Sequence, residues 1–161
     1  MSAIIFHHFP LSPFSEKIRR ILAYKGLPWC SVQQPLMMPK PDLVALTGGY
    51  RRIPVLQIGA DVYCDTALIA RRLDELYPAK PLLPPAQAGL IGMVEDWADH
   101  RLFFQCVPPQ IVALYDALPA GFLDDRAAMS PALTKDGLFK SAPQAWSQAR
   151  LSLAHLEAQL A

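Results

Sequence analysis

The sequence predicts an α/β domain built on a mixed four-stranded sheet, followed by a domain made of helices alone. Residues 1–78 alternate short β-branched or aromatic runs with segments of helical period, in the order β-α-β-α-β-β-α. Residues 79–86 (AKPLLPPA) have the composition of a linker. From residue 87 to residue 161 no strand pattern is visible, and apolar residues recur at helical spacing. We therefore expect a first domain over 1–78, a linker over 79–86 and an all-α domain over 87–161.

Composition limits the kinds of partner that the chain can have. With 52% hydrophobic and 18% charged residues over 161 positions, a packed core is expected. The net charge of +1 gives no reason to expect nucleic acid or an anionic membrane as a partner. The N-terminal apolar run ends at Pro10 and lacks a basic flank, so we do not interpret it as a signal peptide. A cytoplasmic location is the resulting expectation.

The three cysteines do not suggest a metal site. Cys30, Cys64 and Cys106 show neither CxxC nor any other metal-type spacing. In a chain expected in the cytoplasm, they are predicted to be reduced and mostly buried thiols, and no metal is expected.

The first strand and helix meet at a cluster of hydroxyl-bearing residues. Residues 4–9 are typical of a strand, which Pro10 ends. Ser12 stands where an N-cap belongs, Pro13 is suited to the first helical position, and Gly26 is suited to the end of the helix. A strand that leads to an open helix N-terminus forms a site suited to a negatively charged atom.

The remaining elements of the first domain are short and sharply bounded. A second strand is predicted at 29–32, and a helical turn at 42–46 follows an irregular proline-rich connection. Two further strands, 53–58 and 61–64, flank a Gly-first pair suited to a hairpin. Either residue of Asp65-Thr66 can cap the last helix, which Pro78 ends.

Two amphipathic helices are predicted in the second domain. The pair Pro108-Pro109 should kink or end the first of them, a separate piece is expected at 111–118, and residues 119–143 are interpreted as loop or short turns. The last helix reaches Ala161 in mid-pattern, so we expect this domain to be incomplete and residues beyond it to complete it. The two stripes are Leu90, Val94, Trp97, Arg101 and Phe104, and then Trp146, Ala149, Leu153, Leu156 and Leu160.

Three short motifs occur in a specific order along residues 3–78. They are Ser12-Pro13-Phe14-Ser15, Arg51-Arg52-Ile53-Pro54-Val55 and Asp65-Thr66. In this order and spacing the chain resembles the glutathione S-transferase superfamily, whose members join a thioredoxin-like domain to a helical domain. The resemblance covers residues 3–78 well and the helical part only in outline.

The first motif is similar to the Ser-Pro-Phe stretch of serine-type transferases. The resemblance implies that Ser12 donates a hydrogen bond to the thiolate of glutathione, with Ser15 as the alternate. A free thiol has a pKa of about 8.5, so few molecules are ionised at neutral pH without such help. The alternative is that Ser12 is only a helix N-cap. Because neither serine is a cysteine, a dithiol reductase mechanism is excluded.

The second motif implies a contact with the cysteinyl part and with a carboxylate of glutathione. In the family, the proline here follows a cis peptide bond, and the residue before it, Ile53 in this chain, pairs through its backbone with the cysteinyl part. Pro54 is otherwise an ordinary strand start. Arg52, or Arg51 beside it, stands where a basic residue often meets a glutathione carboxylate, and Lys40 is a further candidate. For each of these cations, solvated surface charge is the alternative.

The third motif implies a site for the γ-glutamyl end of glutathione. The Thr66 hydroxyl and the helix amides would take the carboxylate, and Asp65 would take the ammonium. A capping Asp-Thr pair explains the same residues. The chain departs from the family at Thr47-Gly48, where Asn-Pro is frequent.

Two other groups of residues invite a functional interpretation. His7 and His8 point to opposite faces of a strand and cannot share a ligand, so one is predicted to be a hydrogen-bonded sheet residue and the other a surface residue. An electrophile pocket is expected between the domains, and packing of the helical core explains the aromatic candidates equally well. Its candidate lining is Trp97, Arg101, Phe104 and Tyr115.

The predicted function is transfer of the glutathione thiolate to a small apolar electrophile. Glutathione is the co-substrate, no metal is needed, and a homodimer without nucleic-acid or membrane partners is expected from the resemblance. A glutathione-dependent isomerase or dehalogenase is one alternative. A non-catalytic binding or scaffold protein on the same fold is another, which the Thr47-Gly48 departure and the incomplete helical domain make reasonable.

Overall fold

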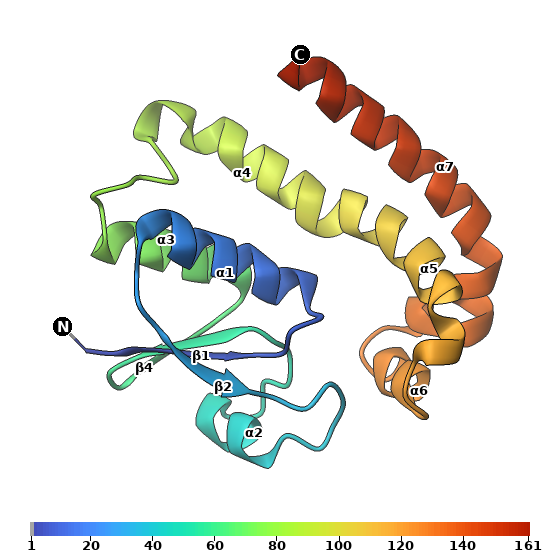
Figure 1. Ribbon diagram of the computed structural model, residues 1–161, viewed down its shortest axis with the longest axis horizontal. Helices are drawn as coiled ribbons and strands as arrows, with labels where there is room; N and C mark the ends of the chain where they lie inside the picture. Colours follow the sequence, from blue (N-terminus) through green and yellow to red (C-terminus); the bar gives the residue numbers. More distant parts are fainter. Residues whose placement is uncertain (1) are drawn as a thin grey trace. The chain divides into compact units, whose positions relative to one another are not determined.

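Residues 2–161 are described by a computed structural model, and they divide into two units (Figure 1). The first unit ends at Ala88 and the second spans Gly89–Ala161. Met1, at which the predicted first domain begins, lies outside the described residues. The boundaries at 78 and 86 stay predictions.

A mixed four-stranded sheet forms the centre of the first unit. Its order is β2-β1-β3-β4. β1 and β2 are parallel, whereas β1 with β3 and β3 with β4 are antiparallel. The predicted sheet and the predicted order of elements are confirmed. The strands are β1 (Ile4–His8), β2 (Cys30–Gln33), β3 (Val55–Ile58) and β4 (Asp61–Cys64).

Helices cover both faces of this sheet. α1 (Pro13–Lys25) and α3 (Thr66–Leu76) lie on one face, and α2 (Pro41–Thr47) lies on the other (Figure 1). α1 begins after the N-cap Ser12 and ends at Gly26, whose φ of 69° is left-handed, as its sequence predicts.

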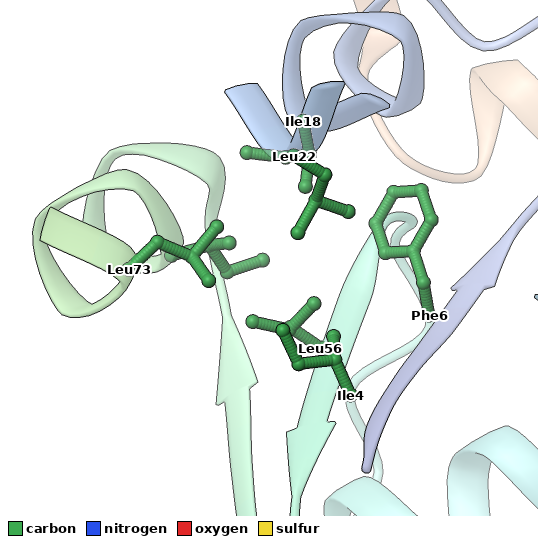
Figure 2. Packing of buried hydrophobic residues seen from close by; sticks show 7 residues of the cluster. Ile4, Phe6, Ile18, Leu22, Leu56 and Leu73 are labelled. Atoms are coloured by element: carbon green, nitrogen blue, oxygen red, sulfur yellow. The ribbon is translucent and has the colours of Figure 1, made fainter. Parts of the chain in front are cut away.

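The core of the first unit lies between the sheet and the helix pair α1 and α3. Figure 2 shows side chains from both strands and helices converging there. Each fully buried apolar side chain contributes roughly 1.5–3 kcal/mol by its removal from water. The labelled residues, none more than 4% exposed, are Ile4, Phe6, Ile18, Leu22, Leu56 and Leu73.

Both histidines of β1 are buried, so the prediction that one of them is a surface residue is wrong. His7 is 8% exposed and His8 is 4% exposed. β1 is an interior strand, and helices lie over both of its faces. Burial lowers the pKa of both imidazoles; a hydrogen bond to Gln57 opposes this for His7, and the charge of Arg19 adds to it for His8.

The cysteines are free, and the prediction of mostly buried thiols is wrong for Cys30. Cys30 is exposed because β2 is an edge strand with little cover. Cys64 and Cys106 are half-buried, and burial raises the pKa of both thiols. A raised pKa keeps these two thiols protonated and unreactive at neutral pH.

A buried lysine at the end of α1 holds three segments of the first unit together. Lys25 Nζ donates to Asp74 Oδ1 at 2.6 Å, and to the carbonyls of Tyr77 and Lys80 at 2.9 Å each. The Lys25 side chain is 1% exposed and that of Asp74 is 13% exposed. Three acceptors around the ammonium offset the free-energy cost of removing its charge from water.

The carboxylate of this pair also fixes the chain that follows α3. Asp74 Oδ1 accepts the Leu82 amide at 2.8 Å, and Oδ2 accepts the Leu83 amide at 3.0 Å. Burial raises the pKa of Asp74, but the hydrogen bonds from Lys25 and from these two amides outweigh it and hold the pKa below its ordinary value. The Asp74 carboxyl group is therefore ionised in the fold at neutral pH.

The second unit consists of helices, as predicted, but their bounds differ from the prediction. A π-helical segment, Trp97–Leu102, joins α4 (Ala88–Asp96) to α5 (Phe103–Ala113). α5 continues through Pro108 and Pro109, so of the two predicted outcomes, a kink or an end of the helix, the end is wrong and the kink stays a prediction. A proline inside a helix costs about 3 kcal/mol, and packing of α5 on α7 (Lys135–Leu160) opposes that cost.

The prediction of loop or short turns over residues 119–143 is wrong for 122–127 and for 135–143. α6 (Phe122–Ala127) lies within it, and α7 begins at Lys135. The Thr134 hydroxyl caps α7 by accepting the Gly137 amide at 3.3 Å, which lets the helix begin well before its internal proline, Pro143. None of the helices in residues 2–161 is long and apolar enough to cross a membrane.

α7 buries a different face from the predicted one. Its buried residues are Leu138, Ala142, Ala145 and Ala149. Small side chains let the backbones of packed helices approach closely, and Ser152 Oγ donates to Gln105 Oε1 of α5 at 2.8 Å. Of the predicted stripe only Ala149 is buried; the exposed members are Trp146, Leu153, Leu156 and Leu160.

Replacing Asp74 by alanine should lower the free energy of unfolding by about 3 kcal/mol at neutral pH, because the buried Lys25 would lose its counter-ion. The stabilisation of the fold by the Asp74 carboxylate is fully present at a pH above the pKa that Asp74 has in the unfolded chain, about 4. Because the pKa of Asp74 is lower in the fold, this stabilisation is lost as the pH falls through the folded pKa. Urea unfolding of both proteins at neutral and acidic pH measures the two effects.

Glu75→Ala is the matched control. Glu75 is adjacent in sequence, and its ion pair with Arg72 leaves the Glu75 side chain 64% exposed. Its loss should cost less than about 1 kcal/mol. Equal losses in the two variants would contradict the structural role of the buried pair.

Candidate functional site

The register of the sheet brings the three sequence motifs to one end of the first unit. β1 pairs with β3 through His7 and Val55, and β3 pairs with β4 through Val55 and Cys64. One edge of the sheet, where β1 and β4 end and β3 begins, therefore holds three segments: the proline before Val55, the aspartate after Cys64 and the chain that leaves β1. Pro54, Asp65 and the turn before Ser12 are thus brought together by the sheet itself.

Ser12 is the N-cap of α1, and the cap does not use the proton of its hydroxyl group. Its Oγ accepts the Ser15 amide at 3.1 Å, and the residue is 5% exposed. The cap uses only the oxygen as acceptor, so the hydroxyl proton can be donated to a further acceptor. Ser15 is 0% exposed, and within residues 2–161 its hydroxyl has no hydrogen-bond partner. Ser12 is the more accessible of the two candidates.

Asp65 caps α3 from a strained backbone conformation. Its Oδ1 accepts the amides of Ala67 at 2.7 Å and Leu68 at 3.3 Å. Its φ of 77° and ψ of 129° lie outside the regions that residues other than glycine usually adopt. Such a conformation costs about 1–3 kcal/mol and is found mostly at functional sites.

Thr66 connects the N-terminus of α3 with α1. It is 6% exposed, and its Oγ1 accepts a hydrogen bond from Lys17 Nζ at 3.3 Å. The two helix N-termini are therefore close, with a cation between them, which favours a negative ligand group. Sequence reasoning missed Lys17, because a lysine in the charged stretch 16–20 usually lies in solvent.

The second motif has the backbone geometry that its resemblance implies. The Ile53-Pro54 peptide bond is cis, which confirms that expectation. Pro54 is buried and Ile53 is half-buried. Arg52 is exposed and Arg51 is half-buried.

Lys40 is not a solvated loop lysine. It is 4% exposed, and its Nζ lies 5.9 Å from the centre of the Phe9 ring. This cation–π contact places Lys40 beside the turn that leads to Ser12. The sequence alternative of a solvated charge is wrong for this residue.

The departure at Thr47-Gly48 produces an ordered end for α2. Gly48 has a φ of 65° and caps the helix, which only a residue tolerant of the left-handed region does without strain. Thr47 Oγ1 lies 2.7 Å from the carbonyls of both Leu43 and Tyr50 and donates to one of them at a time. The hydroxyl of Thr47 fastens the loop that leads to the second motif.

Two of the candidate pocket residues line a half-open groove on the second unit. Trp97 and Arg101, both in the π-helical segment, line this groove of about 490 Å³ together with residues of α5 and α7. Phe104 is 47% exposed, and Tyr115 packs edge-on against Phe139 at 5.3 Å. The electrophile pocket itself stays a prediction.

Comparison with known proteins gives a consistent result. Residues 6–81 match the family model of the glutathione S-transferase N-terminal domain. Glutathione S-transferase U6 of Arabidopsis thaliana is 32% identical over 93 residues, which are 56% of this chain and 42% of that protein. A probable glutathione S-transferase of Oryza sativa subsp. japonica, GSTU1, is 31% identical over 112 residues, 64% of this chain and 48% of the relative.

A solved structure extends the similarity beyond the first unit. The crystal structure of a GST-like protein from Pseudomonas syringae is 40% identical, has a TM-score of 0.74, and covers 99% of this chain and 50% of that one. Residues 6–81 therefore belong to the glutathione S-transferase superfamily, and the structural similarity extends over the rest of the chain. A glutathione-bound theta class transferase from Xanthomonas axonopodis pv. citri has a TM-score of 0.70 over 99% of this chain and 71% of its own, and at 22% identity it shows the fold alone.

Membership of the glutathione S-transferase superfamily confirms the resemblance and the fold class. The chain spans between 34% and 48% of the length of the curated relatives that it matches. The reaction, the substrates and the roles of individual residues are therefore matters for a proposal.

Asp65→Ala should lower the free energy of unfolding by about 1 kcal/mol, because alanine removes the cap of α3 and keeps a disfavoured backbone conformation. Asp65→Asn should change it by only a few tenths, since the asparagine oxygen still caps and asparagine tolerates positive φ. Thermal unfolding of the three proteins measures the difference. A loss in Asp65→Asn as large as in Asp65→Ala would show that the charge, and not the cap, stabilises this helix.

Proposed function

We propose that this chain binds glutathione at the edge of the sheet in its first unit and activates the glutathione thiol for transfer to a small apolar electrophile. The observation that carries the proposal is the convergence of the Ser12 turn, cis-Pro54 and Asp65-Thr66 at that edge. Membership of the glutathione S-transferase superfamily supports it independently.

The proposed binding mode assigns each end of glutathione to a separate group. The γ-glutamyl carboxylate binds at the N-terminus of α3 beside the Thr66 hydroxyl, where Lys17 adds positive charge. Asp65 keeps one oxygen in its cap and offers the other to the ammonium. The backbone of Ile53 pairs with the cysteinyl unit. The glycyl carboxylate binds Arg52, with Lys40 as a further cation.

Ser12 has the proposed role of stabilising the thiolate. The glutathione thiol loses its proton to solvent, and the Ser12 hydroxyl and the amides at the start of α1 donate hydrogen bonds to the sulfur anion. Each unit by which the pKa falls corresponds to ~1.4 kcal/mol of preferential binding of the anion. The sulfur then forms a bond to carbon of the electrophile, and the electron pair passes to the leaving group or to the adjacent atom. The protein orients the reactants, and glutathione supplies the nucleophile.

The assembly and location of the protein remain part of the proposal. A homodimer in the cytoplasm is expected from the resemblance to the superfamily, and analytical ultracentrifugation of the full chain tests the oligomeric state.

Ser12→Ala should raise the pKa of the bound glutathione thiol by about one unit, because one donor to the anion is lost. Ser12→Thr keeps a hydroxyl and a cap and should stay close to wild type. Ultraviolet absorbance of the thiolate, followed against pH in the complex, measures the pKa. If Ser15→Ala raises the pKa and Ser12→Ala does not, the alternate serine is the donor.

Thr66→Val should weaken glutathione binding about tenfold, because it leaves a ligand carboxylate without its hydroxyl donor at nearly unchanged side-chain volume. Titration calorimetry with the full chain measures the affinity. Glu75→Ala, near the far end of the same helix, is the control and should bind like wild type. Absence of glutathione binding by the wild type would favour the non-catalytic alternative. Binding without conjugation would direct the search to isomerisation or dehalogenation.

A further inference from the structure

One arginine of α1 contacts the turn that leads to Ser12. Arg19 Nη2 donates to the Pro10 carbonyl at 2.9 Å, and Nη1 lies 3.5 Å from the Phe9 carbonyl. Its Nε donates to Glu16 Oε2 at 2.7 Å, which fixes the plane of the guanidinium. The Arg19 side chain is only 20% exposed. A planar group with several donors is suited to holding two carbonyls in one geometry.

Apart from the contact of the Phe9 ring with Lys40, the described residues show few other attachments of this turn. The Ser12 amide donates to the Phe9 carbonyl at a long 3.3 Å. Pro10 and Pro13 have no amide hydrogen to donate, and Leu11 is 82% exposed. The bonds from Arg19 are therefore a large share of what orders the backbone immediately before Ser12.

His8 supplies the second anchor for the guanidinium. Its ring stacks on Phe6 at 4.8 Å, and its Nδ1 lies 3.0 Å from Arg19 Nη1. An arginine only donates, so Nδ1 must hold a lone pair, and the ring proton is on Nε2, 2.8 Å from Ser31 Oγ. The side-chain amide of Gln33, 3.2 Å from the same Nε2, then presents its oxygen and not its nitrogen to the ring. A neutral histidine locked in one tautomer thus connects the sheet to Arg19.

We infer that Arg19, held by His8, is a positioning residue that fixes the Phe9–Ser12 turn and thereby aims the Ser12 hydroxyl. Neither residue touches glutathione in the proposed binding mode, and both act through Ser12. The inference about the turn stands on the contacts above. Its consequence for the thiol rests on the proposed function.

The first test needs no ligand. In the full chain, Arg19→Ala should speed hydrogen exchange of the Ser12 and Ser15 amides about tenfold, while the Leu22 amide in mid-helix keeps its rate. Arg20→Ala is the matched control. Arg20 makes the same kind of ion pair with Glu16, at 2.6 Å, but its side chain is 81% exposed and bonds no carbonyl of the turn.

The outcomes of this test are distinct. Faster exchange confined to the turn in Arg19→Ala supports the inference. Equal rates in the two variants, or an equal acceleration at Leu22, would overturn it, because Arg19 would then stabilise only the helix. Arg19→Lys should exchange like Arg19→Ala, since one ammonium does not reproduce the fork of donors.

The second test measures the bound thiol. Arg19→Ala should raise the pKa of glutathione in the complex by about half a unit or more, and Arg20→Ala should leave it unchanged. Bound glutathione with an unaltered thiol pKa in Arg19→Ala would overturn the link to Ser12. If the wild type does not bind glutathione, the proposed function fails, and the exchange rates still decide whether Arg19 holds the turn.

A pair of His8 variants separates anchoring from general packing. His8→Asn keeps an oxygen that can accept from Arg19, and its turn should exchange at nearly the wild-type rate. His8→Leu fills the space between Phe6 and Trp29 without an acceptor, and its turn should exchange like that of Arg19→Ala. The same exchange rate in both variants would show that the Arg19–His8 contact does not position the turn.

Discussion

The pairing of β3 with its two neighbours is the constraint on which the rest of the first unit depends. Phe6 of β1 stands opposite Leu56 of β3, and both are 0% exposed, so packing against α1 and α3 permits only this register. A slip of β3 by one residue against β1 would turn Leu56 away from the core. The same register determines where Pro54 meets Asp65 and the turn before Ser12. Apolar packing energy is therefore what holds the polar end of the sheet in shape.

Most of the first unit could be predicted from the sequence because the residues that begin and end its helices and strands act on their immediate neighbours. Ser12, Pro13 and Gly26 mark the ends of α1 within one turn of the residues they affect. The second unit lacks such signals. A stripe drawn from Leu90 to Phe104 assumes a constant period, whereas the π-helical segment adds a residue to one turn and rotates the helix beyond it by about 100°. On α7 the buried face is mostly alanine, which gives a weak hydrophobic signal beside exposed leucines.

The residues of the candidate site likewise fall into those that the sequence predicted and those that it did not. Ser12, Pro54 and Asp65-Thr66 could be found because each belongs to a short motif with its own backbone requirement, and their roles remain proposals. Lys17 and Arg19 could not, since the contacts that matter lie outside their own helix: Lys17 reaches Thr66, 49 positions away, and Arg19 reaches back to the carbonyls of Phe9 and Pro10. Nothing in the neighbouring residues of an arginine on a charged helix indicates that its donors reach backwards to a turn. Long-range partners of surface-like cations require the structure.

The buried Lys25–Asp74 pair has a consequence for dissecting the molecule into fragments. Lys80 gives its carbonyl to the ammonium, and the amides of Leu82 and Leu83 bind the carboxylate, so residues after α3 belong energetically to the first unit. A fragment cut at Pro78, where the helical pattern stops, would strip a buried ion pair of three of its hydrogen bonds and admit water to it. A fragment that runs past Leu83 keeps them. The smallest autonomous piece is thus set by the solvation of one charge pair and not by the last turn of a helix.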